Sequence, residues 1–241
     1  MKKIMIVNTS TEYFGNTETP TGLWLSELVH FYDAFKDTNV DIDLFNITGG
    51  NTPIDPVSLS PFMLDNTTKA YYNNEHFMDM LKYSQPISEA QPDKYDAVYF
   101  TGGHGVMYDF PENKFIQSAV NTIYEQGGIV SAVCHGVAAL LNVKDAGGTF
   151  LLQNKNVTGF SNVEEVLAKR DTMIPFHLQN EIKHRGASYH FGRVPFTSTL
   201  EVDDRIITGQ NPQSPSQVAE AVKKQDRKST RLNSSHSLVS R

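Results

Sequence analysis

The sequence predicts an α/β fold: a doubly wound, mostly parallel sheet with helices on both faces and a small inserted cap. Three observations support this prediction. Strand and helix patterns alternate along the chain, which is typical of a parallel sheet covered by helices. The length of 241 residues suits one such domain with a sizeable core. A polar segment rich in proline, asparagine and serine interrupts the alternation between residues 46 and 92.

The first part of the chain contains two strands and a helix before this interruption. Lys3–Val7 is an apolar run of strand length. Gly22–Phe35 places its large apolar residues at helical spacing, and Val40–Phe45 alternates as a half-buried strand does. Within residues 46–92 only Phe77–Tyr83 has a helical pattern, so we interpret this segment as an insertion or cap.

The second part of the chain resumes the alternation. Tyr95–Thr101 is a strand that ends in GGHG, and Lys114–Gln126 is a helix closed by two glycines. Ile129–Val133 is a short apolar run that indicates a buried strand. The remaining predicted elements are a helix from Gly136 to Leu141, a short strand at Asn156–Gly159, helices at Val163–Lys169 and Pro175–Arg185, a strand at Arg205–Thr208, and a last helix at Ser214–Lys224.

Residues 1–225 are therefore predicted to form one domain, and residues 226–241 are excluded from it. The final segment begins at Asp226, is rich in serine, arginine and asparagine, and has little apolar periodicity. We expect a non-native tail, translated from adaptor or vector sequence; the alternative is a native disordered tail.

Composition and charge exclude several classes of protein. The formal net charge of −6 argues against a nucleic-acid binder. No apolar stretch approaches the roughly 18 residues of a membrane helix, and the N-terminal apolar run is too short for a signal peptide. One cysteine cannot form an internal disulfide, which fits a reducing compartment. We expect a cytoplasmic protein that binds neither nucleic acid nor membrane.

The single cysteine, Cys134, stands between the predicted strand Ile129–Val133 and the helix that begins at Gly136. A residue held in a sharp turn from strand to helix has the arrangement of a nucleophile elbow. A helix N-terminus lowers the pKa of such a thiol, and the backbone N–H of His135 would face an oxyanion formed at the sulfur. The alternative is a buried, inert cysteine. We predict a reactive thiolate, with His135 as the candidate base.

The chain resembles the ThiJ/PfpI superfamily, which is similar to class I glutamine amidotransferases, and within it the branch of heat-shock chaperones and glyoxalase III enzymes. The similarity extends from Ile4 to Lys224. The motifs TGLWLSELVH, FTGGHGVMYDFPEN, GGIVSAVCHGVAAL, VTGFSNVEE and RIITGQNPQS carry it, and the second and third are the most specific. The resemblance implies a flavodoxin-like sheet and a Cys-His-acid site that needs neither metal nor organic cofactor.

The resemblance also implies roles for individual residues. Cys134 corresponds to the nucleophile and His135 to the adjacent histidine. Glu165 corresponds to the acid that orients this histidine, although an alignment shifted by one residue would assign the role to Glu164. Glu27 corresponds to a second carboxylate that approaches the thiol.

Two further inferences concern the surroundings of the thiol. The apolar neighbours of Glu27 on its predicted helix suggest partial desolvation, which raises the pKa of a carboxyl group and suits proton transfer. The GGHG loop corresponds to the segment whose backbone helps to form an oxyanion hole, so Gly103 and His104 are implied. The other histidines lack the spacing of metal ligands, and no metal is predicted.

The implied function is a glyoxalase III-like enzyme that converts methylglyoxal-type 2-oxoaldehydes to 2-hydroxy acids such as D-lactate through a hemithioacetal on Cys134. The redox change is internal to the substrate, so neither nicotinamide nor glutathione is expected; no G-x-G-x-x-G follows the first strand. Two alternatives stay open. One is an amidase or peptidase of the same fold; the other is a holdase chaperone or redox sensor, in which an apolar patch at Tyr71–Tyr83 would bind unfolded proteins. The oligomeric state is also open, a homodimer included.

Overall fold

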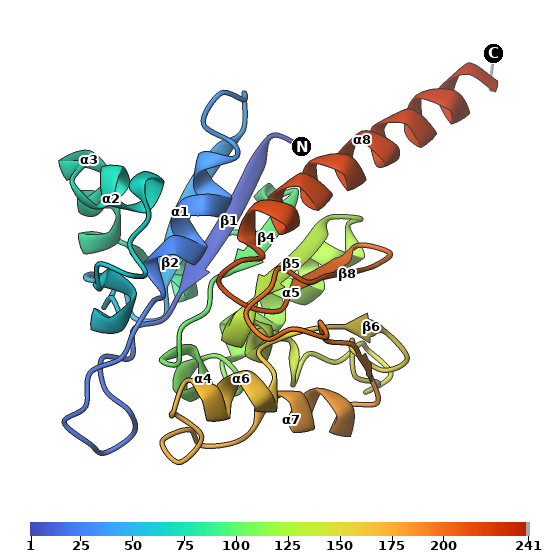
Figure 1. Ribbon diagram of the computed structural model, residues 1–241. Helices are drawn as coiled ribbons and strands as arrows, with labels where there is room; N and C mark the ends of the chain where they lie inside the picture. The colour runs from blue at the N-terminus through green and yellow to red at the C-terminus, as the bar shows by residue number, and fades with distance from the viewer. Residues whose placement is uncertain (240–241) are drawn as a thin grey trace.

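The computed structural model describes residues 1–239 and is built around a seven-stranded sheet (Figure 1). The strand order is β3-β2-β1-β4-β5-β9-β8, and every neighbouring pair is parallel except β8 and β9. A separate pair, β6 and β7, lies outside this sheet. The strands are β1 (Lys3–Asn8), β2 (Asp41–Asn46), β3 (Gln85–Pro86), β4 (Ala97–Phe100), β5 (Ile129–Val133), β6 (Asn156–Val157), β7 (Ser188–Tyr189), β8 (Leu200–Asp203) and β9 (Ile206–Gly209).

The order of the strands confirms the predicted fold class. Without the edge strands β3 and β8, the sheet reads β2-β1-β4-β5-β9, which is the flavodoxin-like order 2-1-3-4-5. The central strands β4 and β5 are buried along their whole length, as expected for parallel strands covered on both faces. At the carboxyl end of each lies a segment that carries predicted site residues, the GGHG loop after β4 and Cys134 after β5.

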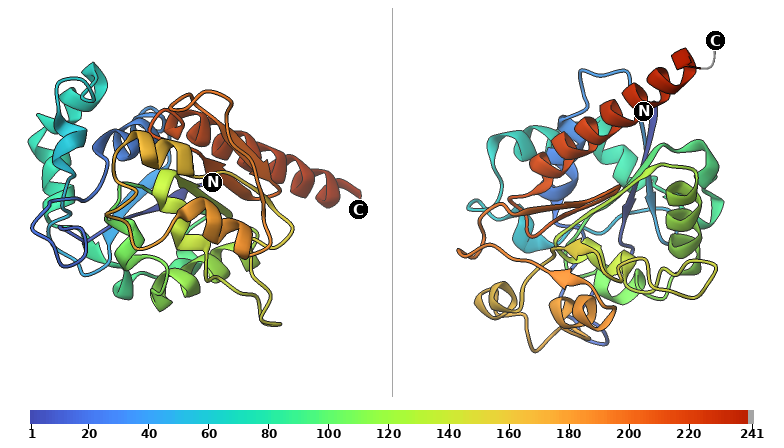
Figure 2. Two further views of the ribbon diagram at one scale, coloured as in Figure 1. Left: turned by 60° about the horizontal axis from the view of Figure 1, so that its bottom comes forward. Right: turned by 90° about the vertical axis from the view of Figure 1, so that its right-hand side faces the viewer.

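Helices cover both faces of the sheet (Figure 2). The helices α1 and α8 pack side by side on one face, and α5 packs against β4 and β5 on the other. The α-helices are α1 (Leu25–Asp33), α2 (Asn66–Tyr72), α3 (Glu75–Lys82), α4 (Val106–Asp109), α5 (Lys114–Glu125), α6 (Asn162–Leu167), α7 (Leu178–His184) and α8 (Pro215–Val239). Short 3-10 helices are η1 (Pro56–Leu59), η2 (Ile87–Glu89), η3 (Pro92–Lys94) and η4 (Cys134–Leu140).

The cap consists of α2 and α3 with their flanking loops, and it packs beside α1 (Figure 1). Tyr32, Tyr71 and Phe77 form an aromatic cluster between α1 and the cap, and the Tyr71 hydroxyl donates a hydrogen bond of 2.9 Å to Asp33. Phe77 is 3% exposed. Tyr71 and Phe77 therefore hold the cap on the domain and do not belong to an exposed patch. Tyr72 and Tyr83 in the same segment are exposed, at 38% and 68%, so binding of unfolded proteins there stays a prediction.

The last helix, α8, begins near the predicted position but extends past the predicted end at Lys224 to Val239, and its second half projects from the domain (Figure 1). Residues 226–239 are helical here, and the expectation that 226–241 is a non-native or disordered tail stays a prediction; its last two residues lie outside the described part of the chain. None of the helices within residues 1–239 combines the length and apolar character that a membrane crossing requires.

Candidate active site

Cys134 occupies a tight turn at the carboxyl end of β5. Its φ of 56° lies in the left-handed region, which non-glycine residues rarely adopt. The turn packs directly on β4, since a Cβ atom at Gly136 would lie 2.5 Å from the carbonyl oxygens of Phe100 and Thr101. Instead of an α-helix starting at Gly136, the 3-10 helix η4 starts at Cys134 itself. The predicted nucleophile elbow is present, but its helix is tighter and begins earlier.

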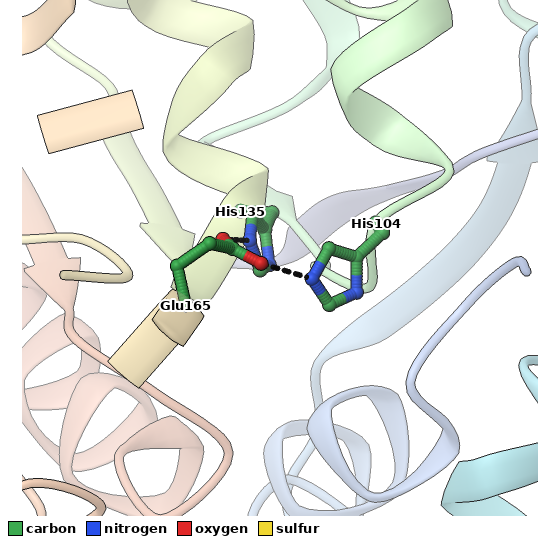
Figure 3. A group of neighbouring side chains, drawn as sticks. All are labelled: His104, His135 and Glu165. Carbon is green, nitrogen blue, oxygen red and sulfur yellow. Dashed lines mark hydrogen bonds and ion pairs between the residues drawn. The ribbon is translucent and has the colours of Figure 1, made fainter. Parts of the chain in front are cut away.

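A chain of short contacts leads away from the Cys134 sulfur, and Figure 3 shows its histidine and glutamate members. His135 Nδ1 lies 3.3 Å from Cys134 Sγ, and His135 Nε2 lies 2.8 Å from Glu165 Oε2. The other carboxylate oxygen of Glu165, Oε1, lies 2.7 Å from His104 Nε2. Both imidazole rings therefore point toward one carboxylate, and all three side chains are buried (Figure 3).

The charges of this group follow from its burial. Burial alone would raise the pKa of Glu165, but the positive potential of His135 and the hydrogen bonds from both histidines outweigh it and hold this pKa well below its usual range. Burial lowers the pKa of His104 to about 4, so this ring is neutral at pH 7. An ionised Glu165 accepts an N–H from each Nε2. In the neutral form of His135, this hydrogen bond leaves Nδ1 with a free lone pair toward the sulfur.

Glu27 reaches the thiol from the first turn of α1. It is completely buried, and its Oε2 accepts a hydrogen bond of 2.7 Å from the Gly102 backbone N–H. Burial raises its pKa to about 8, although hydrogen bonds with the Cys134 thiol and with Gly102 lower it. Glu27 is therefore mostly protonated at pH 7, and its O–H can donate to the sulfur.

The thiol itself differs from the sequence-based expectation. Burial raises the pKa of Cys134. An ionised Glu27, above its own pKa of about 8, raises it further by its charge and its hydrogen bond, whereas the His135 backbone N–H lowers it. The predicted lowering is wrong because the sequence shows the turn but not how completely neighbouring groups cover the sulfur; Cys134 is 3% exposed. The resting site thus holds a thiol, and His135 Nδ1 is placed to remove its proton.

Cys134 lines a cavity of about 660 Å³. Cys134, His135 and the GGHG loop line its base. The start of α1, the cap loop that follows η1 and the end of α6 form its walls. A buried cysteine that lines a cavity of this size differs from an inert core thiol, because a small ligand can reach it.

The chain matches the DJ-1/PfpI family over residues 26–225, which includes the cysteine turn and both glutamates at the site. The chain belongs to the DJ-1/PfpI family.

Several known proteins are similar to the chain over most of its length. Glyoxalase 3 of Candida albicans is 33% identical over 92% of this chain and 97% of its own. The glutathione-independent glyoxalase HSP31 of Saccharomyces cerevisiae is 28% identical over 88% of this chain and 93% of its own.

Solved structures extend the comparison to three dimensions. The Rapid Encystment Protein 24 kDa of Francisella tularensis superposes with a TM-score of 0.90 at 41% identity, covering 93% of this chain and 99% of its own. Glyoxalase III of Candida albicans superposes with a TM-score of 0.83 at 30% identity, covering 93% and 97%. The predicted resemblance to the ThiJ/PfpI superfamily and its glyoxalase III branch is confirmed.

In this DJ-1/PfpI chain the neighbouring residues Glu164 and Glu165 have different hydrogen-bond partners. Glu165 contacts His135, as the resemblance implies. Glu164 instead accepts hydrogen bonds of 2.8 Å from the Phe196 backbone and from the side chains of Gln210 and Asn211. It also completes a capping box with Ser161 at the start of α6. Glu164 therefore fixes the helix that presents Glu165, and it is Glu165 that lies against His135.

The GGHG loop contributes more than the backbone that the sequence suggested. Gly103 has a φ of 99°, and a side chain there would collide with the Gly22 carbonyl oxygen. Its N–H donates no hydrogen bond to any residue between 1 and 239, so it is free to bind an oxyanion. The imidazole of His104, by contrast, belongs to the Glu165 network. Sequence reasoning missed this contact because the two residues are 61 positions apart.

His104, His135 and Glu165 also lie close enough to share a metal ion, since their ligand atoms fall within 4.8 Å of one another. Two histidines and one carboxylate are an ordinary ligand set for several transition metals. In this structure the same atoms are joined by hydrogen bonds, so a metal would have to replace both contacts to Glu165.

Proposed function

We propose that this DJ-1/PfpI protein is a glutathione-independent glyoxalase that converts methylglyoxal-type 2-oxoaldehydes to 2-hydroxy acids. The observation that carries the proposal is the chain of contacts from Cys134 through His135 to Glu165 at the base of an accessible cavity. The names of the Candida albicans and Saccharomyces cerevisiae relatives support it.

The first step is addition of the sulfur to the aldehyde carbon. As the C–S bond forms, the thiol proton moves to His135 Nδ1, and the ionised Glu165 stabilises the resulting imidazolium. The aldehyde oxygen becomes an oxyanion. The free N–H of Gly103 and the backbone N–H of His135 are the proposed donors to it, before His135 returns the proton and leaves a neutral hemithioacetal.

The second step moves hydrogen between the two carbonyl carbons of the substrate. His135, again neutral, removes the hydrogen of C1 as a proton, while the C1 hydroxyl passes its proton to the oxygen on C2, which gives an enediolate. The imidazolium of His135 then returns its proton to C2, which leaves a thioester at C1 and an alcohol at C2. C1 has been oxidised and C2 reduced by the same electron pair, so the proposed reaction uses no external redox partner. Glu27 contacts the thiol but does not line the cavity, so its proposed role is to stabilise the thiolate rather than to transfer the proton between C1 and C2.

The last step is hydrolysis of the thioester. Water activated by His135 attacks C1, the sulfur leaves with a proton, and the 2-hydroxy acid is released; for methylglyoxal this is lactate, and we propose the D-enantiomer. The remaining parts of the proposal are a single domain over residues 1–225 with a cap in 46–92, a cytoplasmic location suited to one free thiol, and a protein that acts alone or as a homodimer.

The test is consumption of methylglyoxal by purified protein without added thiol, metal or nucleotide, with lactate measured as product. The wild type should turn over, and Cys134→Ser, which keeps the shape of the site, should lose at least about a thousandfold of the activity. Equal activity in Cys134→Ser would overturn the proposal. Release of ammonia from glutamine would favour an amidase instead. Suppression of client aggregation by both proteins, without turnover, would favour a holdase.

A further inference from the structure

The active-site cavity is larger than methylglyoxal requires. Its volume of about 660 Å³ lies within the range of roughly 300–1,000 Å³ found for pockets that enclose drug-sized ligands. Methylglyoxal carries a single methyl group beside its two carbonyls. Once its aldehyde carbon is placed at Cys134, most of the cavity would still contain water.

Large apolar side chains form much of the cavity lining. Trp24 contributes from the N-cap of α1 and Leu64 from the cap, and Phe160, Leu167 and Phe196 contribute from the segment just before α6, its end and the loop before β8. Leu167 is 56% exposed and Phe196 is 42% exposed, so both have apolar surface that no other side chain covers. Burial of such surface by a ligand is favourable by about 25 cal/mol per Å².

Most polar side chains that line the cavity already have hydrogen-bond or ion-pair partners. His30 Nε2 lies 2.8 Å from Asp65. Asp55 accepts hydrogen bonds from the Val57 backbone and the Thr21 hydroxyl. Arg170, a cation that also lines the cavity, places its guanidinium 5.0 Å from the centre of the Phe14 ring. A polar substituent on the substrate would compete with these contacts, whereas an apolar one would not.

We propose that the preferred substrates are 2-oxoaldehydes that carry an extended apolar substituent, bound in a subsite formed by Trp24, Leu167 and Phe196. This inference rests on the proposed function and specifies its substrate class. The dicarbonyl end reacts at Cys134, and the substituent replaces water along the apolar wall. The exposure of Leu167 and Phe196 then has an explanation, because both side chains form a binding surface that the substrate covers.

A homologous series of straight-chain alkyl 2-oxoaldehydes tests the proposal, because the reactivity of the dicarbonyl changes little along it. Methylglyoxal, 2-oxobutanal, 2-oxopentanal and 2-oxohexanal would be compared by kcat/KM with the wild-type protein. Each fully buried methylene should raise kcat/KM by up to about threefold to fourfold. We expect 2-oxohexanal to exceed methylglyoxal at least about tenfold. A flat or falling series would overturn the inference.

A matched pair of variants locates the subsite. Leu167 and Val166 are adjacent on α6 and are 56% and 57% exposed, but only Leu167 lines the cavity. Leu167→Ala should flatten the chain-length dependence severalfold, because kcat/KM for 2-oxohexanal should fall more than kcat/KM for methylglyoxal. Val166→Ala should behave as wild type with every substrate. Equal effects of both substitutions would contradict the assigned subsite.

Two outcomes separate this inference from the proposed function. If no 2-oxoaldehyde is consumed, the proposed function fails. If methylglyoxal is consumed but longer alkyl chains are not preferred, only the substrate class fails. As a further arm, 4,5-dioxopentanoate offers a carboxylate on a chain of similar length. A preference for it over 2-oxohexanal would show that Arg170 selects an anionic substituent, and would overturn the apolar assignment.

Discussion

Replacement of Glu27 by glutamine should stabilise the protein, and more so as the pH rises. In the folded protein Glu27 keeps its proton up to about pH 8, whereas its ordinary pKa is 4.5. At pH values between 4.5 and about 8, unfolding therefore releases a proton from Glu27. The wild type loses stability as the pH rises through this range. Glutamine has nearly the same shape, can still accept the Gly102 N–H, and has no proton to lose.

The magnitude follows from the two pKa values. Burial of Glu27 costs about 1 kcal/mol of folding free energy at pH 5, about 3 kcal/mol at pH 7 and about 5 kcal/mol at pH 9. Against a total stability of roughly 5–15 kcal/mol, this difference is large. Urea denaturation of wild type and Glu27→Gln at these pH values should show a stability gap that grows by about 4 kcal/mol.

Glu165→Gln is the control, because its effect on stability should change with pH in the opposite direction. The pKa of Glu165 is lowered in the folded state because the attraction of the histidines outweighs burial, so its contribution to stability is present above pH 4.5 and is lost as the pH falls. Glu165→Gln should thus be less stable than wild type at neutral pH, with a gap that narrows in acid. A gap for Glu27→Gln that is equal at pH 5 and pH 9 would refute the reasoning about its buried carboxyl group.

Three further predictions concern the site and its scaffold. Glu165→Gln should lower kcat/KM for methylglyoxal by about 10²–10⁴ while circular dichroism stays unchanged, because the imidazolium of His135 loses its counter-charge. Gly136→Ala should destabilise the protein to urea by at least about 1–3 kcal/mol, since its Cβ would lie 2.5 Å from the carbonyl oxygens of Phe100 and Thr101. Gly147→Ala should be nearly neutral, because its Cβ would lie 3.3 Å from the side chain of Asp145. Alkylation of Cys134 by iodoacetamide should still accelerate above about pH 8.5, because burial raises the thiol pKa; a plateau below pH 7 would contradict this.

The buried strands could be predicted from the sequence with little error. Strands covered on both faces read as continuous apolar runs, and Ile129–Val133 has the same bounds in the sequence analysis and in the structure. The edge strand Leu200–Asp203 was missed because it is short and only partly buried, and its polar and apolar residues give too short a pattern of alternation. The helix Asn66–Tyr72 was missed because its sequence is polar; Asp65 caps it, and packing against α1 stabilises it.

The active site could be predicted only as far as local sequence determines it. Cys134 and His135 follow from the turn between a strand and a helical segment, and the burial of Glu27 follows from its apolar helix neighbours. The contact between His104 and Glu165 depends on the packing of two loops, which no local pattern encodes. The raised pKa of the thiol depends likewise on total burial, which outweighs the local effect of the turn.

The covalent bond between Cys134 and the substrate is the central element of this account, and rapid quenching tests it most directly. Wild-type protein would be mixed with isotopically labelled methylglyoxal, stopped in acid within one turnover, digested and analysed by mass spectrometry. The account predicts label on the peptide that contains Cys134, formed and lost at rates that match turnover, and none in Cys134→Ser. Turnover of labelled substrate without label on Cys134 would contradict it.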